Sequence, residues 1–313
     1  MARGLKAPLA LVAAALGAVY VIWGSTYLGI MIAIETLPPL LMSSLRFLVA
    51  GTILYVLTRP GLRPTRRHWA GAAVIGAFLL AGGNGGVAWA EQRIDSGVAA
   101  LLVATLPLWL AIFDRVLNGR RLAPGAVLGL VVGFGGVALL VRPGGGIDAL
   151  GAFVCLLAPM AWAAGSLVAR DTAQPARPLL GAGMQMLAGG ALLALVGTAT
   201  GELSRVDLAA VSTRSLLAVA YLIVFGSLVA YTAYVWLLKV APTSTVGTYA
   251  YVNPVVAVLL GSAFLGEPIT ASTGLAGAAI VASVVLILRA PAAPPVVRMP
   301  RREPREEGAT LAA

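Results

Sequence analysis

Long apolar runs, separated by short polar connections, fill most of the chain. Each run is close to the about 20 residues that cross about 30 Å of hydrocarbon as a helix. The pattern therefore predicts an all-α integral membrane protein with ten transmembrane helices. The expected spans are residues 9–34, 39–58, 69–90, 97–117, 123–141, 150–169, 178–198, 215–238, 243–265 and 271–288. The connections are too short to hold a soluble domain.

Composition agrees with this class. Of the 313 residues, 59% are hydrophobic and only 11% are charged, so little of the chain can face water. The single cysteine, Cys155, and the single histidine, His68, exclude a disulfide framework and a cysteine or histidine metal site. We expect no cofactor and no metal. The apolar spans also contain no pair of acidic residues and no set of metal-ligating residues that could act as a catalytic site. We therefore do not expect an enzyme.

Charge predicts the orientation in the membrane. The net charge of +10 would suit nucleic acid, but the basic residues occupy short connections, where they orient a membrane protein. Most Lys and Arg fall on the side of the two termini when connections are assigned to alternating sides. We therefore expect cytoplasmic N and C termini and a lipid bilayer, not nucleic acid, as partner. Residues 290–313, rich in Pro, Arg and Glu, are expected to form a disordered cytoplasmic tail.

The chain repeats itself once. Trp89 and Pro107 correspond to Trp236 and Pro254 when the second half is laid on the first, and hydropathy stays in phase. This predicts two repeats of five spans, residues 9–142 and 148–289. Because five is odd, the two copies must insert upside down relative to each other. Inverted repeats are typical of alternating-access transporters, whose substrate site lies near mid-membrane between the halves.

One stretch stands out as a candidate site lining. Residues 245–261, TVGTYAYVNPVVAVLLG, carry several hydroxyls and Asn253 just before Pro254. Pro254 removes a backbone donor and loosens the helix, which frees carbonyls near residues 248–250. We interpret this span as lining a polar cavity. The alternative is that the hydroxyls and the amide only tie helices together, as they commonly do in bundles.

Similar polar and aromatic residues recur at mid-depth in other spans. Trp23 and Tyr27 are four apart on one helix face, and Ser227, Tyr231 and Tyr234, at i, i+4 and i+7, form one polar stripe. Asn84 lies among four glycines, a sequence that suits either close packing or an unwound point. The candidate substrate-binding residues are Trp23, Thr26, Tyr27, Asn84, Trp89, Trp162, Ser166, Tyr231, Tyr234, Tyr249 and Asn253. Without fixed charge, they suit an amphipathic solute.

Two charged residues are candidates for binding or coupling. Arg46 is a lone cation inside the second span, which the many apolar neighbours still allow to insert. It could bind a substrate carboxylate; alternatively it pairs with backbone carbonyls or an acid, or reaches the interface. Glu91, at the outer end of the third span, could carry a coupling proton if it is buried, although loop carboxylates usually face water. Glu267, between Gly266 and Pro268, is interpreted as a structural turn residue.

At these residues the chain resembles a known family. IWGSTYLGI, SSLRFLVAG, GNGGVAWAEQ, SGVAALLVATLPLW, TYAYVNPVVAVLLG and FLGEPIT are similar to the EamA family of the drug/metabolite transporter superfamily, most closely its YedA-type exporters. The resemblance implies two inverted five-helix halves and efflux of amino acids, metabolites or drugs across the bacterial inner membrane. It also implies a cavity lined mainly by the first, third, fourth, sixth, eighth and ninth helices. One departure is Arg120 after Gly119, where the family often has Gly-Glu.

The function hypothesis is a secondary transporter, multi-pass in the bacterial inner membrane. It exports a small amphipathic metabolite or drug by alternating access. The alternative is an exporter of amino acids or other carboxylated metabolites, with Arg46 as anion anchor. A channel is disfavoured, because scattered hydroxyls supply no continuous polar pore. We expect a monomer or a weak dimer.

Overall fold

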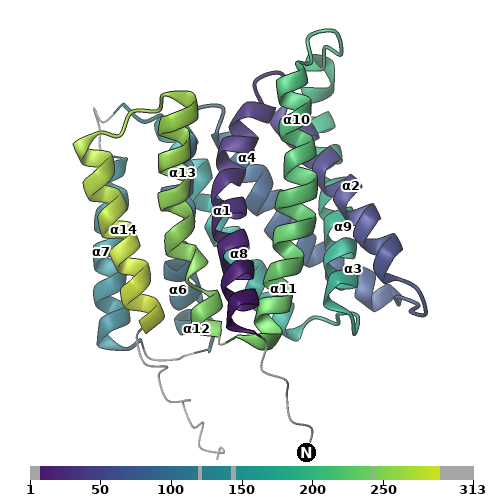
Figure 1. Ribbon diagram of the computed structural model, residues 1–313, viewed down its shortest axis with the longest axis horizontal. Coiled ribbons are helices and arrows are strands. Elements are labelled where there is room, and N and C mark those ends of the chain that lie inside the picture. Colours follow the sequence, from purple (N-terminus) through teal and green to yellow (C-terminus); the bar gives the residue numbers. More distant parts are fainter. Residues whose placement is uncertain (1–7, 119–121, 142–145, 242, 290–313) are drawn as a thin grey trace, which may run out of the picture.

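The protein is a bundle of helices. The computed structural model describes residues 8–118, 122–141, 146–241 and 243–289, and all regular structure in them is helical. The helices stand side by side and roughly upright in Figure 1. Within these residues, eight helices are long and apolar enough to cross a membrane, and the shorter apolar helices Pro124–Leu140 and Tyr249–Leu265 stand among them.

The helices follow one another through short connections. In chain order they are α1 (Leu9–Ala33), α2 (Pro39–Thr58), α3 (Arg66–Gly76), η1 (Ala77–Gly85), α4 (Gly86–Ala90), α5 (Ser96–Val103), α6 (Leu106–Asn118), α7 (Pro124–Leu140), α8 (Ala149–Asp171), α9 (Pro178–Ala199), η2 (Glu202–Arg205), α10 (Thr213–Tyr221), η3 (Leu222–Val229), α11 (Ala230–Val240), α12 (Thr243–Val246), α13 (Tyr249–Leu265) and α14 (Ala271–Arg289).

Proline and glycine set several helix boundaries. Pro39, Pro124 and Pro178 stand in the first turn of α2, α7 and α9, where a missing N–H costs no helical hydrogen bond. Gly266 ends α13 with a φ of 69°, the left-handed conformation that glycine adopts without a steric penalty. The sequence therefore defines both where these helices begin and where α13 ends.

Two of the long helices contain a widened turn. η1 and η3 are π-helical and continue directly into α4 and α11. In η1 the glycines let α8 approach closely: a Cβ on Gly82 would lie 3.0 Å from the Cβ of Ala161, and one on Gly83 would lie 3.2 Å from the Trp162 ring. The glycine-rich sequence thus forms a packing face on a widened helix. π-Helical turns are frequent at functional sites.

Two other long helices are interrupted on the N-terminal side of a proline. α5 gives way to α6 just ahead of Pro107, and α12 gives way to α13 ahead of Pro254. Proline lacks an N–H and clashes with the preceding turn. At each break a threonine hydroxyl donates to the carbonyl three residues earlier, Thr105 to Leu102 and Thr248 to Thr245, both at 2.6 Å. Each hydroxyl is thereby satisfied within its own turn, and the same carbonyls also accept the backbone N–H groups of Thr105 and Thr248 at 3.2 and 3.3 Å.

The bundle is arranged around α1. α1 lies between α13 and the helix formed by α10, η3 and α11 (Figure 1), while α8 packs against η1, α4, α5 and α6. At the two sides of the bundle, α2 packs against α9 and α7 against α14. Helices from both halves of the chain therefore surround a common interior.

Two carboxylates cap helices that are distant in sequence. Glu202, only 4% exposed, accepts from the backbone N–H groups of Leu40 and Leu41, each at 3.0 Å. Glu267 accepts from the N–H groups of Ser96 at 2.8 Å and Gly97 at 3.0 Å. Carboxylates are favourable at helix N-termini because unpaired N–H groups and the positive dipole end meet there. Glu267 therefore has the structural role expected from the sequence, whereas the sequence did not reveal the role of Glu202.

The observed fold agrees with the predicted helical membrane protein. Helical residues occupy every predicted span, although spans 123–141 and 243–265 contain the two shorter helices. α1 begins and α14 ends at the same end of the bundle in Figure 1, as the predicted orientation requires. Ten membrane crossings, their inverted repeat and the cytoplasmic side stay predictions. The predicted tail 290–313 and the Gly119–Arg120 departure lie outside the described residues.

The α2–α9 contact predicts a stability effect at Gly51. A Cβ there would lie 2.9 Å from the carbonyl oxygen of Gly183 and from the backbone nitrogen of Leu187, neither of which can rotate away. Gly51→Ala should therefore cost about 1–3 kcal/mol, the usual cost of overpacking, and lower the melting temperature of the detergent-purified protein. Gly135→Ala is the matched control, because no atom lies within 4 Å of its Cβ position. Equal melting temperatures for the two variants would contradict this packing.

Candidate functional site: a polar and aromatic cavity

A cavity of about 390 Å³ lies inside the bundle. Its walls come from α1, α2, α3, η1, α4, α5, α6, α8, α9, η3, α11 and α13, so both halves of the chain contribute. It includes every predicted substrate-binding residue except Trp89. Those residues are Trp23, Thr26, Tyr27, Asn84, Trp162, Ser166, Tyr231, Tyr234, Tyr249 and Asn253. The structure thus brings together candidates that are more than two hundred residues apart in sequence.

An aromatic cluster forms one wall. The Trp23 ring lies 5.1 Å from the Tyr234 ring and 5.2 Å from the Tyr249 ring, and its indole nitrogen donates to the Gly226 carbonyl at 3.2 Å. The Tyr231 and Tyr234 rings are 6.3 Å apart. These separations are typical of favourable tilted and edge-to-face pairs. The ring packing and the indole hydrogen bond hold the aromatic wall in place.

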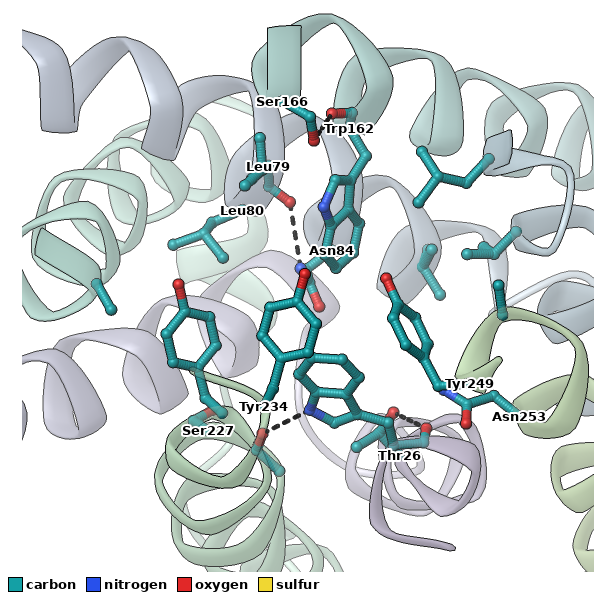
Figure 2. Close-up of a pocket in the computed structure, with 18 of the residues that line it drawn as sticks. Thr26, Leu79, Leu80, Asn84, Trp162, Ser166, Ser227, Tyr234, Tyr249 and Asn253 are labelled. Atoms are coloured by element: carbon teal, nitrogen blue, oxygen red, sulfur yellow. Dashed lines mark hydrogen bonds between the residues drawn. The ribbon is translucent and has the colours of Figure 1, made fainter. Parts of the chain in front are cut away.

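A more polar wall faces this cluster. Figure 2 shows Tyr234 and Tyr249 directed into the space that Asn84 and Trp162 border from the other side. The Asn84 amide donates to the Leu79 carbonyl at 3.2 Å, within the π-helical turn, and the Ser166 hydroxyl donates to the Trp162 carbonyl at 2.8 Å. Both side chains are oriented by their own helix. The wall therefore presents an amide and an indole to the cavity.

The cavity leaves some hydrogen-bonding capacity unused. Among the described residues, the hydroxyls of Tyr231, Tyr234 and Tyr249 have no hydrogen-bond partner, whereas Thr26 donates to the Trp23 carbonyl at 2.6 Å. Asn253, in the amide orientation that satisfies its neighbours, donates to the carbonyls of Tyr249 and Tyr20, both at 3.2 Å. Asn253 thus ties α13 to α1, as the alternative interpretation proposed, whereas Thr26 bonds only within its own helix. The tyrosine hydroxyls are the groups left for a ligand.

Arg46 places a positive charge in the wall. It is only 6% exposed, its Nε donates to the Ser227 hydroxyl at 2.9 Å, and its guanidinium lies 4.9 Å from the Phe47 ring centroid. In the described part of the chain no carboxylate forms a salt bridge with it. Arg46 therefore does not reach the interface. Because the Nε of Arg46 bonds a hydroxyl, the other N–H groups of the planar guanidinium can bind an anion.

Glu91 and Trp89 lie outside the cavity lining. Trp89 packs against the hydrophobic cluster around Leu40 and Phe47, and the Arg93 guanidinium lies 5.0 Å from its ring centroid. Glu91 is only 2% exposed, unlike an ordinary loop carboxylate. Burial raises its pKa well above the usual range; the charge of Glu267 adds to this, and the charge of Arg46 opposes it.

Several lining residues were not singled out from the sequence. Gln174 and Gln185 add amides to the cavity, and their side chains are linked at 3.4 Å. Gln185 could have been found, because it is a lone amide in an apolar span. Gln174 lies in the connection between α8 and α9 and gives no comparable signal. Because Gln174 is exposed, the cavity extends toward that end of the bundle.

The cavity is equipped for binding a solute. In the described residues no group of three His, Cys, Asp or Glu side chains is arranged to hold a metal ion. What the walls offer is aromatic surface, hydroxyls, amides and one guanidinium. This combination suits an amphipathic organic molecule that is stacked and hydrogen-bonded. Fold and cavity together define a polytopic helical membrane protein with a central polar and aromatic cavity.

Comparison with known proteins identifies the family. The EamA-like transporter family is matched at residues 9–142 and 149–289, so the chain belongs to this family. It is 41% identical to the uncharacterized inner membrane transporter YedA of Escherichia coli (strain K12) over 279 residues, which covers 87% of this chain and 89% of that protein. The chain is therefore a multi-pass transporter-family protein of the bacterial inner membrane.

Other similarities extend over a comparable length. Protein PecM of Dickeya dadantii (strain 3937) is 30% identical over 277 residues, covering 85% of this chain and 86% of that protein. A solved crystal structure at 21% identity matches with a TM-score of 0.58 and covers 88% of this chain and 95% of its own. The latter likeness concerns the fold alone.

The Arg46 contact predicts a specific stability effect. Ser227→Ala removes the acceptor of a buried guanidinium N–H, so it should destabilise the protein by about 1–3 kcal/mol. Ser166→Ala is the matched control, because the Ser166 hydroxyl only bonds a carbonyl of its own helix. Thermal unfolding in detergent measures both variants. If Ser227→Ala melts no lower than Ser166→Ala, the Arg46–Ser227 bond does not contribute as described.

Proposed function

We propose that this protein is a secondary transporter that exports a small amphipathic metabolite or drug by alternating access. The observation that carries the proposal is the cavity, which is enclosed by helices of both halves and lined by aromatic rings and tyrosine hydroxyls. Membership of the EamA-like transporter family supports transport as the activity. A binding site between two halves of a bundle is what rocking of one half against the other requires.

The packing of the helices supports an inverted repeat. α1 packs against the helix that contains η3, and its repeat mate α8 packs against the helix that contains η1. α1 also packs against α13, and correspondingly α8 packs against α5 and α6. The pairs α2–α9 and α7–α14 are each formed by one helix and its own repeat mate. This exchange of partners is what a two-fold axis in the membrane plane produces.

The local irregularities support the same symmetry. The two π-helical segments η1 and η3 lie in the third helix of each half, and the breaks before Pro107 and Pro254 lie in the fourth. All four irregular segments border the cavity. Interrupted helices at the substrate site are typical of transporters built from inverted repeats.

Transport by reconstituted protein tests the proposal. Proteoliposomes should move at least one probe among labelled amino acids, phenylalanine included, and the cationic dye ethidium. Trp23→Leu should lower transport efficiency roughly tenfold, because an aromatic contact contributes about 0.5–1.5 kcal/mol beyond its area and Trp23 also orders two tyrosines. Trp69→Leu, in a ring contact with Tyr55 instead, is the control. Failure of every probe, with or without a proton gradient, would remove support for the exporter.

A second candidate is favoured by the position of Arg46. Its buried guanidinium lines the cavity and, among the described residues, meets a hydroxyl instead of a carboxylate. A carboxylated amphipathic solute, such as an amino acid, would satisfy both the aromatic wall and this charge. Under this candidate Arg46 is the anion anchor.

Replacing Arg46 separates the two candidates. Arg46→Gln should abolish transport of labelled amino acids and leave ethidium transport unchanged if Arg46 binds the substrate carboxylate. Arg59→Gln is the control, because Arg59 lies beyond the end of α2, 5.7 Å from the Tyr55 ring. Equal transport of amino acids by Arg46→Gln and wild type would refute the anchor role, and loss of expression would indicate a packing role.

A further inference from the structure

Glu91 is a buried carboxylate without a hydrogen-bond donor. It follows the last residue of α4 and is 2% exposed, and in the part of the chain that the structure describes neither of its oxygens has a partner. Glu202 and Glu267, in contrast, each accept two backbone N–H groups. An ionised carboxylate is very costly to bury without donors. The surroundings of Glu91 therefore favour its neutral, protonated form.

The ionisable groups around Glu91 come from several elements. Tyr27 on α1, Arg46 on α2, Cys155 on α8 and Glu267 after α13 interact with it electrostatically. Asp95, in the same connection, interacts with Glu267 instead. The described residues of η1 and α5 carry no ionisable side chain. Glu267 disfavours a second negative charge here, and Arg46 is the positive charge that favours one.

Arg46 connects Glu91 with the cavity. Glu91 interacts electrostatically with Arg46, and Arg46 lines the cavity. An ionised Glu91 would compensate the Arg46 charge, whereas a neutral Glu91 leaves that charge available. We propose that Glu91 is a proton-binding site, and that its protonation is coupled to the binding of a substrate carboxylate by Arg46. This inference rests on the transport function proposed above.

Coupling of this kind has a definite sign. A proton on Glu91 and a carboxylate on Arg46 each favour the other, because together they leave the net charge of the buried region unchanged. The reciprocity is thermodynamically required: the solute must raise the proton affinity of Glu91 by the same factor by which the proton raises solute affinity. One proton therefore binds with one carboxylate. The coupled step moves both in the same direction, and the gradients of solute and proton set that direction.

Infrared titration of the protein in lipid tests the proton site without any solute. The carbonyl band of a protonated carboxyl should persist at neutral pH, far above the ordinary glutamate pKa of about 4.3, and should vanish in Glu91→Gln. In Arg46→Gln, which keeps Glu91, the titration midpoint of the Glu91 carboxyl band should move to higher pH. The reason is that the positive charge of Arg46, which favours ionised Glu91, is lost. Arg46→Lys and Arg59→Gln should keep a midpoint near that of wild type. An ionised Glu91 at neutral pH, or an unmoved midpoint in Arg46→Gln, would overturn the proposal.

Proton flux with labelled phenylalanine as probe tests the coupling. Wild-type proteoliposomes containing a trapped pH indicator should move a proton with the amino acid, and Glu91→Gln should move the amino acid without one. Amino-acid transport by wild type without proton movement would overturn the coupling. If no probe moves at all, the proposed transport function fails, while the titration still decides whether Glu91 holds the proton.

Discussion

The bilayer imposes the constraint on which the structure depends: inside hydrocarbon, every polar group must find its partner within the protein. Most of them do. Threonine and serine hydroxyls donate to carbonyls of their own helices, and Glu202 and Glu267 neutralise the starts of α2 and α5. At the breaks ahead of Pro107 and Pro254, the hydroxyls of Thr105 and Thr248 donate to carbonyls of their own turn. Among the described residues, few polar groups are therefore left without a hydrogen-bond partner in the protein.

Several of those remaining groups lie at or near the cavity, whereas Ser96 Oγ and Trp109 Nε1, also buried without a partner, belong to residues outside its lining. The tyrosine hydroxyls face the cavity, Arg46 contributes a guanidinium with a single hydroxyl partner, and Glu91 lies buried just beyond the lining. The irregular helices η1 and η3 border the same space. Wide turns and helix breaks cost helical regularity, and here they border the cavity that we propose as the solute-binding site. The proposed binding site and the irregular helix segments thus share one location.

Much of this could be predicted from the sequence. Hydropathy located the helical segments, and polar or aromatic residues in apolar spans located the cavity, because such residues are costly in a membrane without a role. Trp89 was predicted as a lining residue but packs against the cluster around Leu40, since helix rotation decides which face points inward. Gln174 gave no signal, because its role depends on the connection between α8 and α9 folding over the cavity. The burial of Glu91 depends on how elements distant in sequence pack around it, which no local pattern contains.

The account depends above all on a cavity that opens to each side of the membrane in turn. Single cysteines at Ser166 and Tyr249, in a Cys155→Ala background that removes the buried native thiol, test this directly. Membrane-impermeant maleimide applied from either side of oriented vesicles should label both positions, and a transported solute should reduce the labelling. Positions that stay unlabelled from both sides, or that react from one side only under all conditions, would contradict alternating access.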